Sequence, residues 1–288
     1  MSSLQNPQFD EPSADSAPQP QPSLSDSRLP KEFQPAPPPK AGENPVWNGW
    51  DVAQVAGLAV LLALFVVPMI TVTAAQVFVY PHERWLRVAQ KPVLALVSQF
   101  IAYIIVALFM IMLVEGKYRT RFWPAIRWNW PGISGINFVG LGILMLGFDF
   151  LARFFPMPKN TPFDQFFDRP TDAYLTAVFA VTFGPLMEEL FFRGMLYPLL
   201  ARRLGVFGGI SITSLLFGLM HFVQYGRSWG AVLIIVLVGV VLTTIRALTK
   251  SVASCFLAHV GYNGTLMVLA AVATDGFRHM EKAGVLIY

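Results

Sequence analysis

Long apolar runs dominate the sequence after residue 46, and they leave little choice of fold. The runs have about 18 to 25 residues, apart from a longer fourth one, and an α-helix of this length crosses a hydrocarbon core about 30 Å thick. Backbone inside lipid must satisfy its own hydrogen bonds, so these runs are predicted to be transmembrane helices. We expect about seven of them, near residues 53–75, 92–115, 133–155, 174–202, 206–224, 229–247 and 251–273.

The charge content agrees with this reading. Only 13% of the residues are charged and 55% are apolar, whereas a soluble domain has roughly 25% charged residues. The sequence therefore predicts an all-α, polytopic transmembrane bundle over residues 47–288, with the lipid bilayer as its surroundings. The net charge of +4 does not indicate a nucleic-acid partner, because the basic residues are spread over the loops between apolar runs.

Residues 1–46 have a different composition, rich in Pro, Ser, Gln, Asp and Glu and without apolar periodicity. Such a segment cannot bury enough apolar surface to offset its ordering entropy, so a disordered tail is predicted. Loops 116–131 and 193–206 have slightly more Lys and Arg than the loops at the other membrane face. By the positive-inside rule we expect the tail to be cytoplasmic, in a multi-pass protein of the cell (inner) membrane.

Three charges interrupt the fourth apolar run: Glu188, Glu189 and Arg193. A charge in hydrocarbon is costly unless it is paired or lines a wet cavity, so these residues indicate a functional site. Glu189 and Arg193 are four residues apart with the acid first, which predicts a structural ion pair. Glu188 points about 100° away from that pair and stays free to react. Pro185, Gly194 and Pro198 predict a kink in the same run.

Further polar residues lie on the later helices. His259 and Asn263 are four residues apart and so share one helix face, and Phe217 stands one turn before His221. At about 1.5 Å per residue, Glu188 lies roughly 21 Å into its helix and His259 roughly 18 Å below the same face. His221 is expected to be shallower, roughly 5 Å from the end of its helix. We predict one shared site for these residues.

The group suits hydrolysis of a peptide bond by water. Glu188 is a candidate general base, His221 a group that orients and helps deprotonate the water, and His259 with Asn263 hydrogen-bond donors to the oxyanion. An alternative uses Glu188, His221 and His259 as ligands of a catalytic zinc ion with an open water position. The HExxH motif of soluble zinc proteases does not occur in the sequence.

Three motifs occur in order on successive apolar helices: EELFFR at 188–193 fits EExxxR, FGLMH at 217–221 fits FxxxH, and HVGYN at 259–263 fits HxxxN. The chain resembles the CAAX protease and bacteriocin-processing (CPBP) family of intramembrane endopeptidases, which includes the type II CaaX prenyl endopeptidases. The resemblance covers about residues 174–273.

The resemblance implies an endopeptidase that cuts a membrane-associated protein or peptide, with or without a lipid, as in CaaX-type or leader processing. It implies that Glu188 is the catalytic glutamate, His221 the water-activating histidine, and His259 with Asn263 the oxyanion-stabilising pair. Glu189, Arg193 and Phe217 would support them. It also favours the mechanism without a metal over the zinc alternative.

Other interpretations were weighed. Cys255 stands four residues before His259 but is expected to be a small buried hydrophobe rather than a nucleophile. Asp149 and Arg153 are expected to form an ion pair near a helix end. A transporter would show paired broken helices in two related halves, and the sequence shows no such repeat. A non-catalytic membrane immunity or scaffold protein of the same fold stays open as the alternative function.

Overall fold

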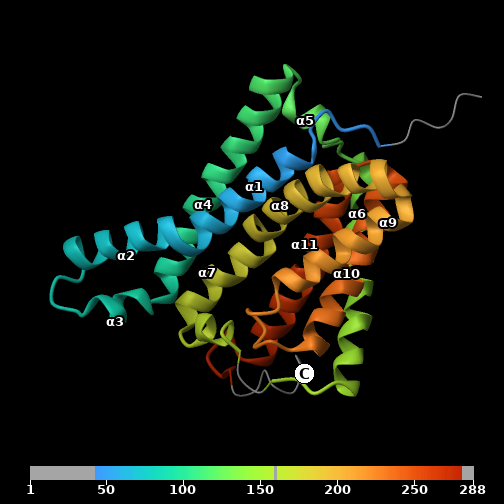
Figure 1. Cartoon of the computed structure of the whole chain (residues 1–288). Helices are drawn as coiled ribbons and strands as arrows, with labels where there is room; N and C mark the ends of the chain where they lie inside the picture. The colour runs from blue at the N-terminus through green and yellow to red at the C-terminus, as the bar shows by residue number, and fades with distance from the viewer. Residues whose placement is uncertain (1–42, 159–160, 281–288) are drawn as a thin grey trace, which may run out of the picture. The chain divides into compact units, whose positions relative to one another are not determined.

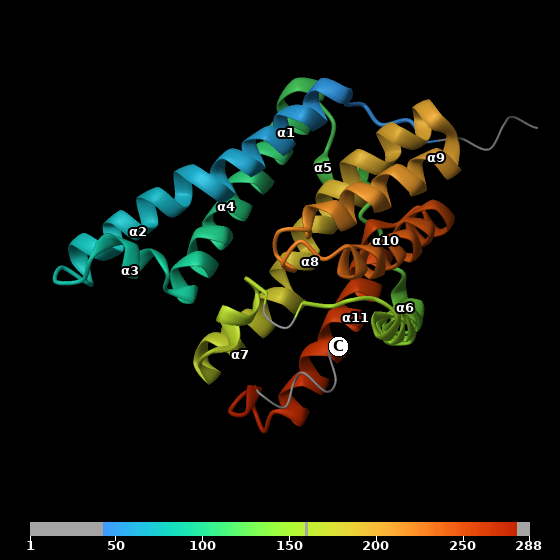
Figure 2. The same ribbon diagram turned by 60° about the horizontal axis from the view of Figure 1, so that its bottom comes forward.

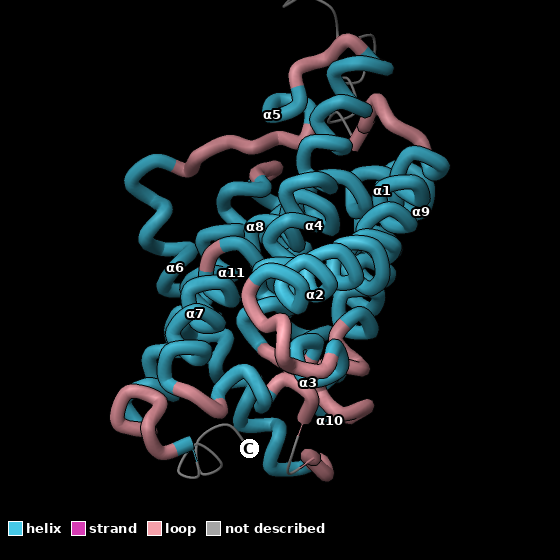
Figure 3. Tube along the Cα trace, turned by 90° about the vertical axis from the view of Figure 1, so that its left-hand side faces the viewer, coloured by secondary structure: helices cyan, strands magenta, loops and turns pink. Residues whose placement is uncertain are grey.

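The computed structural model describes residues 43–158 and 161–280. Every regular element in these residues is helical (Figure 3), which confirms the all-α prediction. Six helical runs are long and apolar enough to cross a membrane, so the chain is an integral, multi-pass membrane protein. Most of the predicted tail lies outside the described residues. Residues 43–46 are described, and Glu43 is buried against the bundle, so these residues belong with the folded part.

The first three runs correspond to the first three predicted helices. The first comprises α1 (Gly49–Leu61), a π-helical turn (Leu62–Val66) and α2 (Val67–Phe78), and the short α3 (Trp85–Ala89) follows. The second comprises α4 (Pro92–Met112) and the π-helical η4 (Leu113–Lys117), before the short α5 (Phe122–Ala125). The third begins after a 3₁₀ turn (Gly132–Ser134) and joins α6 (Gly135–Leu144) to a 3₁₀ helix, η6 (Met145–Phe154).

The second half of the chain holds the remaining runs. A 3₁₀ turn, η7 (Asp164–Phe167), precedes α7 (Pro170–Val181), α8 (Phe183–Glu188), the π-helical η8 (Glu189–Leu196) and α9 (Tyr197–Met220). These are followed by α10 (Trp229–Thr249) and α11 (Val252–Ala273). Figures 1 and 2 show α9 beside α10, and α6 beside α11, and both pairs make extensive contacts.

Gly205 divides α9 into two limbs and accounts for the difference between six apolar runs and seven predicted helices. Its φ of 75° and ψ of 172° are not helical, and only glycine adopts them readily. The ribbon of α9 turns back at this region in Figure 1. A Cβ on Gly209 would stand 3.0 Å from the backbone of Ala201, so the limbs approach closely just beyond the turn. The fourth and fifth predicted helices are therefore the two arms of a hairpin.

Helices α6 and α11 also approach too closely for a side chain at their contact. A Cβ on Gly142 would stand 2.0 Å from the carbonyl oxygen of Ala258, and one on Gly261 would stand 2.3 Å from that of Val139. Small residues at such crossings let helix backbones pack by van der Waals contact, which is the main attraction between helices in lipid. This contact holds α11, and with it His259, in place.

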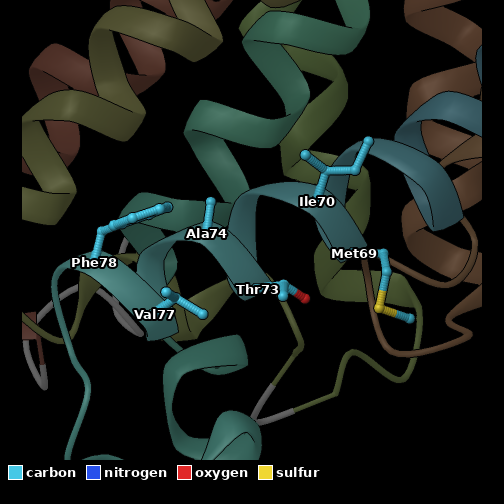
Figure 4. Close-up of a pocket in the computed structure, with 6 residues that line it drawn as sticks. All are labelled: Met69, Ile70, Thr73, Ala74, Val77 and Phe78. Carbon is cyan, nitrogen blue, oxygen red and sulfur yellow. The ribbon is translucent and has the colours of Figure 1, made fainter.

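An open hollow on α2 has no ionisable group in its lining. Figure 4 shows the six side chains that line it, all from one helix: Met69, Ile70, Thr73, Ala74, Val77 and Phe78. Helices α1 and α2 lie beside α4 in Figures 1 and 2. The apolar side chains that α2 exposes suit contact with hydrocarbon and offer no chemistry.

Candidate active site

A break in the helix brings Glu188 to the middle of the bundle. Thr182 (φ −115°, ψ −73°) separates α7 from α8, three residues before Pro185. Proline has no N–H and its ring clashes with the carbonyl four residues earlier, here that of Val181, so the helix bends at this point. The π-helical η8 begins directly after Glu188. The kink predicted from the prolines and Gly194 is confirmed, and both of the adjacent glutamates lie on its far side.

Glu188, His221 and His259 come together. One carboxylate oxygen of Glu188 lies 3.8 Å from Nε2 of His221, and the other lies 3.7 Å from Nε2 of His259. The side chains of Glu188 and His221 are 16% and 13% exposed, and that of His259 is 4% exposed. The carboxylate therefore stands between two imidazoles at a partly exposed site.

His221 lies at the same level as Glu188, and its predicted shallow position is wrong. Glu188 precedes Gly205 by nearly as many residues as His221 follows it, so the hairpin places the two side by side. The limb after Gly205 ends at Met220 and is too short to cross the hydrocarbon core. His221 thus caps a half-length helix, and its depth has to be measured from Gly205.

The hydrogen bond of His221 defines its tautomer. Nδ1 lies 2.8 Å from the carbonyl oxygen of Phe217, and a carbonyl can only accept, so Nδ1 bears the proton. In the neutral ring Nε2 is then a bare acceptor facing Glu188. The Phe217 ring also packs edge-on against both imidazoles, with centroids 5.1 Å from His221 and 5.9 Å from His259.

Glu189 forms the predicted ion pair and has a second partner. Its Oε1 lies 3.0 Å from a guanidinium nitrogen of Arg193, which confirms the pair, and 2.8 Å from Nδ1 of His259. The side chains of Glu189 and Arg193 are both fully buried. A carboxylate that accepts from Nδ1–H fixes the orientation of the ring. Glu189 therefore orients His259, a role that the sequence analysis did not assign to it.

Arg193 is held by several groups at once. Its Nε donates to the Thr243 hydroxyl at 3.2 Å, and a terminal nitrogen donates to the Gly239 carbonyl at 3.1 Å. The guanidinium also lies over the Phe217 ring, 4.4 Å from its centroid. Each of the three guanidinium nitrogens thus has a hydrogen-bond acceptor, as a buried charge requires.

Asn263 is directed elsewhere. Its side-chain N–H donates to the carbonyl of Ala180 at 2.8 Å, next to the break between α7 and α8. Broken helices in membranes leave carbonyls that side chains must satisfy, and Asn263 does so here. The amide has two N–H donors and one is used in this bond. The role of Asn263 at the oxyanion stays a prediction.

Two tyrosines near the site were not anticipated. Tyr103 on α4 interacts electrostatically with Glu188 and hydrogen-bonds Gln99, while its ring stacks on Phe179 at 5.6 Å. Tyr225 lies beside His221, with ring centroids 6.4 Å apart. Gln99 and Tyr103 are one helical turn apart within an apolar run, and that polar pair is a signal the sequence contains.

Asp149 does not form the predicted ion pair with Arg153. The Tyr262 hydroxyl hydrogen-bonds both of its carboxylate oxygens, at 3.1 and 3.2 Å, while the Arg153 guanidinium lies over the Phe150 ring. The reason is the 3₁₀ geometry of η6, in which residues four apart no longer share a face.

Cys255 is buried beside the site without pointing its thiol at His259. Its Sγ lies 3.2 Å from the Leu242 carbonyl and 3.3 Å from the Ser251 carbonyl, so the S–H has backbone acceptors. A buried thiol with such partners behaves as a small hydrophobe. This environment agrees with the expectation that Cys255 is not a nucleophile.

The zinc alternative requires the two imidazoles and the Glu188 carboxylate as ligands. Both imidazoles direct Nε2 toward Glu188, and two histidines with a carboxylate are a donor set that zinc accepts. Within the described part of the chain, however, no group of three or more His, Cys, Asp or Glu side chains is arranged to hold a metal ion.

Comparison with known proteins covers the same region. The family model described as type II CAAX prenyl endopeptidase Rce1-like matches residues 170–265, from the first residue of α7 to just past Asn263. No curated protein and no solved structure matches the chain. All three motifs fall inside the matched region. Residues 170–265 are therefore similar to the Rce1-like type II CAAX prenyl endopeptidases, a protease family, in line with the resemblance that the motifs indicate.

Proposed function

We propose that this protein is an intramembrane endopeptidase that uses Glu188 and His221 to activate water. The observation that supports this most directly is the Glu188 carboxylate between two imidazole Nε2 atoms, 3.8 and 3.7 Å away. Distances of this size leave room for a water molecule that bonds to the carboxylate and to the bare Nε2 of His221.

In the proposed reaction, water attacks the carbonyl carbon of the scissile peptide bond while one of its protons passes to Glu188. The carbonyl oxygen becomes an oxyanion in the tetrahedral intermediate. Glu188 then returns the proton to the departing amine as the C–N bond breaks, which leaves a free amine and a new carboxylic acid that releases its proton to solvent. His221 holds the water by accepting a hydrogen bond from it at Nε2.

His259 is proposed to stabilise the oxyanion. In this proposal the charged form of His259 acts in the reaction, with Nδ1–H donating to Glu189 and Nε2–H donating to the oxyanion. A preorganised donor of this kind contributes about 3 to 4 kcal/mol to transition-state stabilisation. Asn263 is proposed to add its second N–H once a substrate is bound.

The proposed substrate is a membrane-associated protein or peptide, because the site lies within the helices that cross the bilayer. A CaaX-type terminus, with or without a prenyl group, is the substrate class that the family match suggests. We propose that the protein lies in the cell (inner) membrane with its tail in the cytoplasm. The mechanism is proposed to proceed without a metal.

The test uses the full-length protein in liposomes with paired synthetic peptides that end in a CaaX sequence, one farnesylated and one not. Wild type is expected to cut at least one of them, and Glu188→Gln to lower kcat by about 10²- to 10⁴-fold, the usual contribution of a general base. The matched control is Glu83→Gln, which removes a carboxylate from an exposed ion pair with Lys91. Equal cleavage by wild type and Glu188→Gln would contradict the mechanism.

Two further outcomes separate the alternatives. Chelator treatment of the wild type is expected to leave cleavage unchanged, whereas strong inhibition that zinc reverses would favour the metal mechanism. A wild type that binds the peptides and cuts neither them nor other membrane peptides would favour the non-catalytic immunity or scaffold alternative.

A further inference from the structure

A short segment just before α1 is buried against the helix that bears the candidate catalytic residues. Glu43 is 8% exposed and Trp47 is 1% exposed. The indole N–H of Trp47 donates to the carbonyl of Met195 in η8 at 2.9 Å, across 148 residues of sequence. Arg202 donates to the carbonyl of Pro45 at 3.0 Å. We call residues 43–47 the N-terminal strap.

The strap meets η8 where the helix leaves a carbonyl without its usual partner. In a π-helix each carbonyl accepts from the residue five positions later, and for Arg193 that residue is Pro198, which has no N–H. The N–H of Tyr197 is already bonded to the carbonyl of Phe192. The vacancy is filled by Arg246 on α10, whose Nε donates to the Arg193 carbonyl at 3.1 Å.

Glu43 holds Arg246 in this position. The two terminal nitrogens of Arg246 reach the two oxygens of Glu43 at 2.9 and 3.3 Å, so each of its three nitrogens has an acceptor. The Arg246 side chain is 1% exposed, and a buried cation of this kind needs a charged partner. Lys250 and Arg127 also contact Glu43, at 3.1 and 3.4 Å, and so help to fix the carboxylate.

The same residue that accepts from Arg246 leads to the reacting groups. The backbone of Arg193 is held by Arg246, and its side chain holds Glu189, which holds His259, whose Nε2 faces Glu188. The contacts are continuous from Glu43 to the Glu188 carboxylate. All of the side chains between the two ends are buried.

We propose that Glu43, Trp47 and Arg246 are positioning residues for the endopeptidase: they hold η8 so that Glu189 keeps His259 aligned with Glu188. This inference rests on the proposed function but concerns residues outside the three motifs. None of the three touches the reacting atoms. Loss of the strap is therefore expected to misalign His259 while the site keeps its full set of side chains.

The first experiment measures kcat and KM for the CaaX-ending peptide in liposomes. Glu43→Gln keeps the shape of the side chain and removes its charge, and Trp47→Phe keeps an aromatic ring and removes the N–H. Each is expected to lower kcat by about 10- to 100-fold with little change in KM, because misplacing a catalytic group by about 1 Å costs this much. Glu83→Gln, which breaks the exposed pair with Lys91, is the matched control and should leave both constants unchanged.

The second experiment does not depend on cleavage. The Nδ1 proton shared by His259 and Glu189 is expected to give a downfield proton resonance, assigned by its loss in His259→Gln. Glu43→Gln is expected to shift or broaden that resonance, and Glu83→Gln to leave it in place. This readout tests the strap even if the wild type cuts no peptide, so failure of the proposed function and failure of this inference are distinguishable.

The proposal is overturned if Glu43→Gln is folded and has both the wild-type resonance and the wild-type kcat. Should Glu43→Gln fail to fold, Arg246→Lys replaces it, because lysine keeps the charge next to Glu43 but cannot also reach the Arg193 carbonyl with a fixed fork. An unchanged resonance and kcat in Arg246→Lys would overturn the proposal equally. A double variant of Glu43→Gln with Arg246→Lys should be no worse than the worse single variant, since both act through one contact.

Discussion

At the scale of single residues, Glu188 and Glu189 have different roles because their side chains point in different directions. Glu188 faces the two Nε2 atoms, and Glu189, one position later, faces Nδ1 of His259 and the Arg193 guanidinium. A step of about 100° around the helix separates a reactive carboxylate from an orienting one. The orienting carboxylate is paired with the Arg193 guanidinium, which has several fixed partners of its own.

Arg193→Lys tests whether that cation must be a guanidinium. Lysine keeps the charge but cannot bind Glu189, Thr243 and Gly239 in one planar arrangement, and its loss of partners is expected to cost about 3 kcal/mol or more of stability. Thermal unfolding in detergent measures this as a lower midpoint. Arg278→Lys, at an exposed pair with Asp275, is the control and should unfold as wild type does. Equal midpoints for the two variants would contradict the reading of Arg193.

At the scale of elements, the hairpin in α9 decides which residues meet. The limbs before and after Gly205 run back along each other, so Glu188 and His221 reach the same level. Depths counted along the sequence from the ends of the predicted helices had placed them at different levels. The π-helical η8 adds a second device, because it changes the phase of the residues that follow Glu188 and exposes the Arg193 carbonyl to Arg246. The π-helical η8 is mostly buried, and Arg246 satisfies its free carbonyl, whereas Gly205 lies at an exposed turn.

Gly205→Ala is expected to destabilise the hairpin. A φ of 75° with a ψ of 172° is a conformation that residues with a Cβ avoid, at a cost of about 1 to 3 kcal/mol. The thermal unfolding midpoint and the rate of peptide cleavage should both fall, since Glu188 and His221 are positioned by the two limbs. Gly57→Ala is the matched control, because Gly57 is helical with open space around its Cβ position. That substitution should be neutral or stabilise the protein by about 0.5 to 1 kcal/mol. A Gly205→Ala protein as stable as Gly57→Ala would refute the role of the turn.

At the scale of the whole described molecule, the strap contacts α10 through Arg246 and the loop that contains Arg127. Burial alone would raise the pKa of the Glu43 carboxyl, but Arg246 outweighs it, together with Arg127 and Lys250, and holds the pKa below its usual value of 4.5. Glu43 is therefore a charged group at neutral pH, with three cations around it.

The lowered pKa of Glu43 predicts how stability changes with pH. A carboxyl whose pKa is lower in the folded state contributes stability that is fully present above its ordinary value of 4.5 and is lost as the pH falls through the folded value. The unfolding midpoint of wild type should therefore fall below pH 4.5 more steeply than that of Glu43→Gln. Glu83→Gln should follow the wild-type curve. Parallel curves for wild type and Glu43→Gln would show that Glu43 has no such role.

The amino-acid sequence by itself determined the membrane setting, the helical class and the kinked fourth run, and it predicted that Glu188, His221 and His259 come together. Hydrophobic length and buried charge are local properties, and the motif residues are named by their spacing along single helices. The Glu189–Arg193 pair was predictable for the same reason, since both residues lie on one turn of one helix.

Only the tertiary structure decided the level of His221, the bond from Glu189 to His259, the partner of Asp149 and the buried strap. Each depends on backbone that departs from a regular α-helix, at Gly205, in η8, in η6 and before α1. Spacing rules assume regular rise and rotation, so they fail where the backbone changes either one. Contacts between residues far apart in the chain then follow from how the helices pack, which no local pattern encodes.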